Sequence, residues 1–120
     1  MAKKTLVLGG SENPNRYGNM AIHRLRGKGH PVVSIGKRKG EVLDVDIVTE
    51  TQPFDDVDTV TLYLNPKNQE PYYDYILSLK PKRIIFNPGA ENEELASLAA
   101  EKGIEPIEAC TLVMLATGQY

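Results

Sequence analysis

Apolar residues along the chain occur in two arrangements, short continuous runs and sets spaced three or four positions apart. A continuous run such as Thr5–Leu8 is typical of a strand that is buried on both faces of a sheet. Tyr17, Ala21, Ile22 and Leu25 are spaced as on one face of a helix. Strands are expected over residues 5–8, 31–35, 45–48 at an edge of the sheet, 58–64 and 83–86, with a short sixth strand at 104–107.

Helices are expected between these strands. Asn65 and Pro66 predict a helix start, because Asn is a good N-cap and Pro suits the first helical turn, and Pro81 closes that helix. Asn92 caps the next helix, which Gly103 ends. Strands that alternate with helices predict an α/β fold, a three-layer, doubly wound, mainly parallel sheet of five to six strands that is Rossmann-like. A chain of 120 residues has the length of one domain, so we expect a single domain over 1–120.

Such a sheet predicts where a ligand binds, because ligands lie beyond the carboxyl ends of its strands. The loops there cover residues 9–18, 36–40, 65–69 and 87–91. In the first loop, Gly9 and Gly10 allow a sharp turn and a close approach to a ligand. The N–H groups that begin the following helix favour an anion, and Arg16 adds a cation. We interpret this loop as a pyrophosphate site; an ordinary capped turn is the alternative.

The first two loops together argue against a common dinucleotide site. The G-x-G-x-x-G pattern fails, because Ser11 and Pro14 stand where its second and third glycines belong. NAD-binding domains place an acid after the second strand, whereas this chain has the cations Lys37, Arg38 and Lys39 there. These cations favour a phosphorylated ribose, with the 2′-phosphate of NADP or the 3′-phosphate of coenzyme A. A solvated basic turn is the alternative.

The third and fourth loops carry weaker signals. Asn65 and Pro66 are placed to wall an adenine or a pantetheine arm, but helix capping explains them equally well. In the fourth loop, Asn87 offers a polar group and Gly89 a position of close backbone approach.

Composition narrows the function classes. Lys plus Arg number 14 and Asp plus Glu 16, a balance that argues against a nucleic-acid-binding surface. No apolar run approaches the length of a membrane span. The one cysteine, Cys110, excludes an internal disulfide and a Cys/His metal cluster. We therefore expect a cytoplasmic protein with no metal ligands, no membrane or nucleic-acid partner, and no catalytic group that names a reaction.

Four segments resemble the small coenzyme A-binding proteins, single-domain relatives of the coenzyme A-binding domain of succinyl-CoA synthetase alpha subunits. They are residues 7–16, 25–33, 87–94 and 108–114, and the likeness runs from Leu6 to about Met114. The usual first loop of that family reads Gly-Ala-Ser, and Gly10 here replaces the alanine. The resemblance implies a Rossmann-type domain that binds coenzyme A or an acyl-CoA as a small-molecule ligand.

The resemblance also implies roles for single residues. Gly9 and Ser11 match the pyrophosphate loop, with Asn15 and Arg16 close behind, and Lys37 stands near the phosphorylated adenosine. Asn65 and Pro66 match the loop that walls the ligand. The synthetases carry a phosphorylated histidine in a separate domain that has no counterpart in this chain. The resemblance therefore favours a binding module with no activity on its own.

Three alternatives stay open. An NADP-dependent reductase would use the same basic loop, and a coenzyme A-binding subunit of an acyl-CoA ligase would need another chain to complete it. A homodimer is also left open. Cys110 follows the last strand on the ligand side, where it is either a small buried hydrophobe or a partner for the thiol of coenzyme A.

Overall fold

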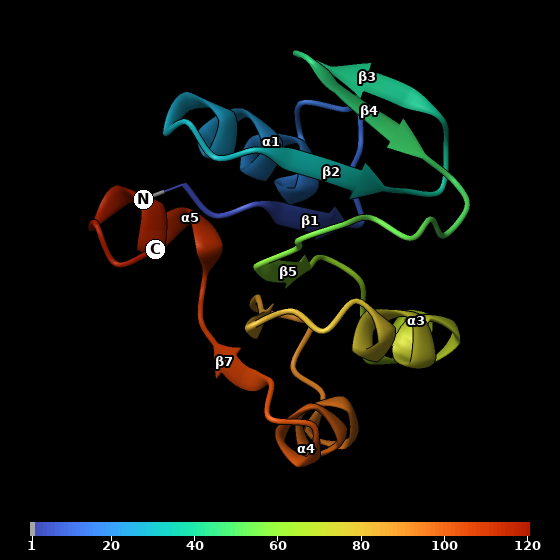
Figure 1. Ribbon diagram of the computed structural model, residues 1–120. Helices are drawn as coiled ribbons and strands as arrows, with labels where there is room; N and C mark the ends of the chain where they lie inside the picture. The colour runs from blue at the N-terminus through green and yellow to red at the C-terminus, as the bar shows by residue number, and fades with distance from the viewer. Residues whose placement is uncertain (1) are drawn as a thin grey trace.

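The computed structural model describes residues 2–120 and holds one seven-stranded sheet with helices on its faces (Figure 1). Along the sheet the strand order is β3-β4-β2-β1-β5-β6-β7, and every neighbouring pair is parallel except β3 with β4. The strands are β1 Thr5–Leu8, β2 Val32–Ile35, β3 Gly40–Val42, β4 Val45–Val48, β5 Thr59–Leu62, β6 Arg83–Phe86 and β7 Glu105–Glu108. This arrangement confirms the predicted doubly wound, Rossmann-like α/β fold.

The sheet has one strand more than expected. Gly40–Val42 pairs antiparallel with Val45–Val48, so β3 forms the edge of the sheet, and the expectation that residues 45–48 lie at the edge is wrong. A run of three residues is too short to show a periodicity in the sequence. Its presence limits the segment between β2 and β3 to residues 36–39.

The helices lie where the sequence predicts them, but one predicted helix is interrupted. The segment after Asn65 is expected as one helix, yet it divides into α2 Pro66–Gln69, the 3₁₀ turn η1 Glu70–Tyr72 and α3 Tyr73–Ser78. Pro71 lies in the 3₁₀ turn, where its missing N–H interrupts a regular helix. The remaining helices are α1 Tyr17–Gly27, α4 Glu93–Glu101 and α5 Thr111–Ala116.

Alternate side chains of the central strand enter two apolar clusters, as the pleat of a strand requires. Leu6 and Leu8 pack with side chains of α3 and α4, whereas Val7 packs with those of α1 and α5. Each face of the sheet therefore has its own helical layer. None of the helices within residues 2–120 is long and apolar enough to span a membrane.

The register of the sheet brings the strand ends to one level. Leu8 lies opposite both Ile35 and Leu62, and Leu62 lies opposite Phe86. We call this side of the sheet, where the parallel strands end, the carboxyl edge, and the opposite side the amino edge. The loops that the sequence singles out all leave the carboxyl edge.

Candidate functional site

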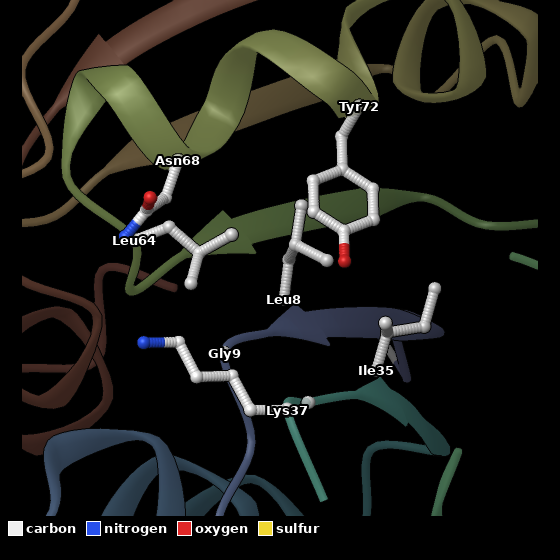
Figure 2. Close-up of a pocket in the computed structure, with 8 residues that line it drawn as sticks. Leu8, Gly9, Ile35, Lys37, Leu64, Asn68 and Tyr72 are labelled. Carbon is white, nitrogen blue, oxygen red and sulfur yellow. The ribbon is translucent and has the colours of Figure 1, made fainter. Parts of the chain in front are cut away.

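A cleft of about 170 Å³ opens at the carboxyl edge, between the ends of β1 and β2 and the segment that follows β5 (Figure 2). The lining residues are Leu8, Gly9, Ile35, Gly36, Lys37, Leu64, Asn68 and Tyr72. Pockets that enclose a whole ligand usually measure 300–1,000 Å³. This cleft therefore has room for one part of an extended ligand, on the scale of a nucleobase.

The walls of the cleft are apolar and aromatic, with one cation. In Figure 2 the ring of Tyr72 points from the helical segment toward Leu8 and Ile35, while the side chain of Lys37 runs across toward Leu64 and Asn68. An aromatic ring above aliphatic side chains suits the flat face of a base. Leu64 and Asn68 belong to the third loop, which the sequence predicts as a wall of the site, whereas Tyr72 is a lining residue that sequence reasoning missed. The turn at Pro71 that breaks the helix was the available signal for Tyr72.

The backbone of the first loop is wedged between its neighbours. Gly9 has a φ of +107°, and the N–H groups of Gly9 and Gly10 donate to the carbonyl oxygen of Ile35 at 2.8 and 3.1 Å. A Cβ on Gly18 would overlap the carbonyl oxygen of Gly9, and one on Gly36 would overlap that of Gly10. These close contacts hold the end of β1, the end of β2 and the start of α1 against one another.

Gly10 has a local packing reason of its own. A Cβ at this position would overlap the hydroxyl of Ser34, which donates to the carbonyl oxygen of Val7 at 2.9 Å. Where the resembling proteins have alanine, this chain therefore pairs glycine with a serine on β2.

Side chains of the first loop hold its own backbone. The hydroxyl of Ser11 accepts the N–H of Asn13 at 3.0 Å, and the side-chain carbonyl of Asn13 accepts the N–H of Asn15 at 2.9 Å. Arg16 precedes α1 and its side chain is exposed. Within residues 2–120, no hydrogen bond uses the N–H groups of Tyr17 and Gly18, the first two residues of α1. The loop is thus ordered and leaves donors at a helix N-terminus, which is the arrangement that binds anions.

The three cations of residues 37–39, which we call the basic loop, are exposed. Among residues 2–120 the ion pairs join Arg26 to Asp44 and Lys82 to Asp58, so the basic loop takes part in none. Lys37 reaches the cleft, and its neighbours lie just outside the lining. The positive charge at the end of β2 is therefore available to an anion.

The third loop combines capping with wall formation. The side-chain oxygen of Asn65 accepts the N–H of Asn68 at 2.9 Å, and Pro66 is the first residue of α2. The capping role that the sequence allows for Asn65 is therefore realised. The residues on either side of this cap, Leu64 and Asn68, are the ones that line the cleft.

In the fourth loop, Asn87 is buried and its amide is used within the protein. It donates to the hydroxyl of Thr61 at 2.7 Å and to the carbonyl oxygen of Leu62 at 2.9 Å, and it accepts the N–H of Thr111 at 2.8 Å. Asn87 thereby fixes the start of α5 on the sheet. Gly89 is exposed with a φ of +91°. Both residues lie at the carboxyl edge, outside the lining of the cleft.

A buried amide joins the third loop to the fourth. Gln69 donates to the carbonyl oxygens of Leu64 and Ala90, both at 2.8 Å, and accepts from the amide of Asn92 at 2.9 Å. Since every polar atom of this side chain has a partner, the network makes a rigid wall for the cleft.

Two side chains near the carboxyl edge, Tyr63 and Cys110, carry groups that can react. Burial raises the pKa of Tyr63 to about 12, so its phenol stays uncharged at neutral pH. Cys110 is a free, half-buried cysteine that precedes α5. Within residues 2–120, no three His, Cys, Asp or Glu side chains gather to hold a metal ion. The site offers binding groups and no nucleophile paired with a base.

Comparison with known proteins identifies the family of this chain. The family model described as a CoA binding domain matches residues 3–116. The chain belongs to this coenzyme A-binding family. A solved structure described only as an uncharacterized protein is 54% identical, covers 100% of this chain and 99% of its own, and superposes with a TM-score of 0.97.

More distant solved structures share the fold. A hypothetical protein from Pyrococcus horikoshii OT3 is 23% identical with a TM-score of 0.87, over 97% of this chain and 83% of its own. A protein from Thermus thermophilus is 21% identical with a TM-score of 0.82, over 99% and 91%. The comparison with curated proteins gives no match. Family membership thus supports coenzyme A binding in general, and names no reaction.

Proposed function

We propose that the protein binds coenzyme A or an acyl-CoA along the carboxyl edge of its sheet. The pyrophosphate lies on the first loop, where Gly9, Gly10 and Ser11 supply close backbone and Asn15 and Arg16 stand at the helix entrance. Family membership and the unused N–H groups at the start of α1 support this placement. The adenine lies in the cleft of about 170 Å³, against Tyr72.

The observation that carries the proposal is the basic loop. Three adjacent exposed cations without ion pairs repel one another, and a phosphate beside them removes that repulsion. We place the 3′-phosphate of coenzyme A between Lys37 and Arg38. Asn65 and Pro66 hold the wall on the far side of the cleft, and Asn87 and Gly89 border the path of the pantetheine arm.

We assign no reaction to the protein. A single free cysteine suits a reducing compartment, and we place the protein in the cytoplasm as part of the same proposal. The alternatives of an NADP-dependent reductase and of a subunit of an acyl-CoA ligase make different demands on ligand and partner, and the first of them is tested directly below.

Calorimetric titration with coenzyme A, acetyl-CoA, dephospho-coenzyme A, NADP and NAD tests the proposal. We expect coenzyme A to bind about tenfold or more tightly than dephospho-coenzyme A, because one charge-assisted contact to phosphate is worth roughly 1.4 kcal/mol or more. NAD, whose adenosine ribose carries no 2′- or 3′-phosphate, should bind weakly. Equal affinity for the two forms of coenzyme A would refute the role of the basic loop, and preference for NADP would favour the reductase.

A further inference from the structure

A carboxylate of the first loop is bonded to the opposite side of the basic loop. Oε2 of Glu12 accepts the backbone N–H of Glu41 at 2.8 Å, across 29 positions of sequence. Glu41 is the middle residue of β3, and its neighbour Gly40 begins that strand. A Cβ on Gly40 would overlap the carboxyl group of Glu12, so the bond depends on glycine there. We call these three residues the Glu12 clamp.

The pairing of strands in the sheet holds both ends of the basic loop, and the clamp adds a direct bond from the first loop to the end at β3. Before the loop, the N–H of Gly36 donates to the carbonyl oxygen of Val48 at 2.9 Å. After the loop, Glu12 holds the chain at Glu41. The segment between these two anchors carries three exposed cations on a short tether. Glu12 therefore ties the far end of this segment directly to the first loop, which carries the proposed pyrophosphate site, in addition to the pairing of β3 with β4.

This contact holds the basic loop in position without pairing the charges of its side chains. A carboxylate beside a basic segment would ordinarily form an ion pair, and that pair would weaken the attraction for phosphate. Within residues 2–120 no ion pair involves Glu12, whose described bond is to a backbone N–H. The loop is thus anchored by an acceptor while its side-chain cations stay uncompensated.

We propose that Glu12 is a positioning residue that sets the preference for a ligand with a phosphorylated ribose. It acts by holding the basic loop at the distance from the pyrophosphate loop that such a ligand spans. This inference rests on the proposed binding of coenzyme A, and it adds that discrimination between coenzyme A and its dephosphorylated form depends on a side chain that is not itself a cation. An edge-strand contact that serves stability alone is the competing explanation.

Two variants break the clamp from opposite sides, and a third keeps it. Glu12→Ala removes the acceptor, Gly40→Ala pushes the carboxyl group away, and Glu12→Gln retains an oxygen acceptor without the charge. We expect the first two to bind coenzyme A about fivefold more weakly, a change typical of losing one positioned hydrogen bond to a charged group. Dephospho-coenzyme A should lose less than about twofold, since it lacks the phosphate that the loop reads. Glu12→Gln should bind both ligands at least as well as the wild type.

The double variant Glu12→Ala/Gly40→Ala distinguishes one clamp from two separate effects. Its affinity for coenzyme A should match that of either single variant, because both remove the same contact. Calorimetric titration of the five proteins with the two ligands, at matched melting temperatures, supplies the data. Equal losses for the two ligands, or a Glu12→Gln variant as weak as Glu12→Ala, would overturn the inference while leaving coenzyme A binding intact. A wild type that binds neither ligand would instead refute the proposed function, and the inference with it.

Discussion

Cations at the two edges of the sheet have different partners. At the amino edge, Arg83 donates to Thr59 and to the backbone oxygen of Tyr120, and its guanidinium lies 4.4 Å from the centre of the Tyr120 ring. Arg26, near the end of α1, pairs with Asp44 through two hydrogen bonds of 2.8 Å. At the carboxyl edge, the basic loop has no such partner among residues 2–120. Arg83 and Arg26 are thus bonded within the protein, whereas the described part of the chain gives the basic loop no ion pair.

This difference has an energetic meaning. A guanidinium that meets a carboxylate, a backbone oxygen and an aromatic face has its charge compensated and its donors used. Adjacent lysine and arginine side chains without partners repel one another and contribute nothing favourable to folding. The charges of Arg83 and Arg26 therefore contribute to stability in a way that those of the basic loop do not.

The largest expected effect is a loss of stability, and it differs between the two ends of α1. Gly18→Ala places a Cβ against the carbonyl oxygen of Gly9, a backbone atom that cannot move without shifting the end of β1. We expect it to lower the free energy of unfolding by about 1–3 kcal/mol, the range for overpacking a rigid contact. Gly27→Ala, at the other end of the same helix, has nothing within 4 Å of the added Cβ. That control should change stability by less than about 1 kcal/mol in urea unfolding. If the two variants lose similar amounts of stability, the close contact between Gly18 and Gly9 does not have the effect described.

The next effect concerns ligand affinity. Changing Lys37, Arg38 and Lys39 together to Gln should weaken coenzyme A binding about 30-fold or more, because several charge-assisted phosphate contacts are lost at once. The matched control changes Lys80, Lys82 and Lys102, three exposed lysines around a groove at the amino edge, in the same way. Each variant removes three positive charges, so the change in the net charge of the protein is the same in both. Calorimetry should show the large loss in the first variant, and a comparable loss in the control would show that only net charge matters.

A smaller effect is the dependence of stability on pH at the amino edge. Burial, and then the nearby charge of Lys3, hold the pKa of His30 below its usual value, and its Nδ1 accepts the N–H of Lys3 at 2.9 Å. The unfolded chain therefore takes up this proton first, near pH 6.5, and stability falls as the pH drops below that value. His30→Asn keeps an acceptor and does not titrate, so its stability should change less between pH 7.5 and 5.5.

Urea unfolding of the wild type and His30→Asn at the two pH values measures this effect. His23→Asn, at an exposed position of α1, serves as the control and should keep the pH dependence of the wild type. A His30→Asn variant with the full dependence would show that other groups carry it. Coenzyme A affinity should be unaffected by this substitution, because His30 lies at the edge away from the cleft.

The sequence predicted the fold well where its signals are local. Continuous apolar runs gave the parallel strands, and Asn65 and Asn92 marked helix starts that the structure confirms. It missed β3 because three residues show no period, and it missed the break at Pro71 because the cap at Asn65 and the stop at Pro81 were taken as the two ends of one helix. For Gly10 the sequence predicted a sharp turn and a close approach to a ligand, but it did not predict the packing against Ser34, which is distant in sequence.

For the site, the sequence predicted which loops meet at the carboxyl edge, but not which partners their side chains contact. The amide of Asn87 is satisfied by Thr61, Leu62 and Thr111, partners that only the folded sheet brings together. The importance of Glu12 was equally hidden, since its partner Glu41 is far along the chain. Ligand contact by Gly9, Ser11, Arg16 and Lys37 remains a prediction.

The role of the basic loop is tested most directly by one pair of titrations, repeated on two proteins. Coenzyme A and dephospho-coenzyme A are titrated into the wild type and into the triple Gln variant of residues 37–39. If the basic loop binds the 3′-phosphate, the wild type prefers coenzyme A by about tenfold or more, and the variant binds the two ligands with similar, weak affinity. A preference that persists in the variant would contradict the claim that unpaired cations at the carboxyl edge read the phosphate.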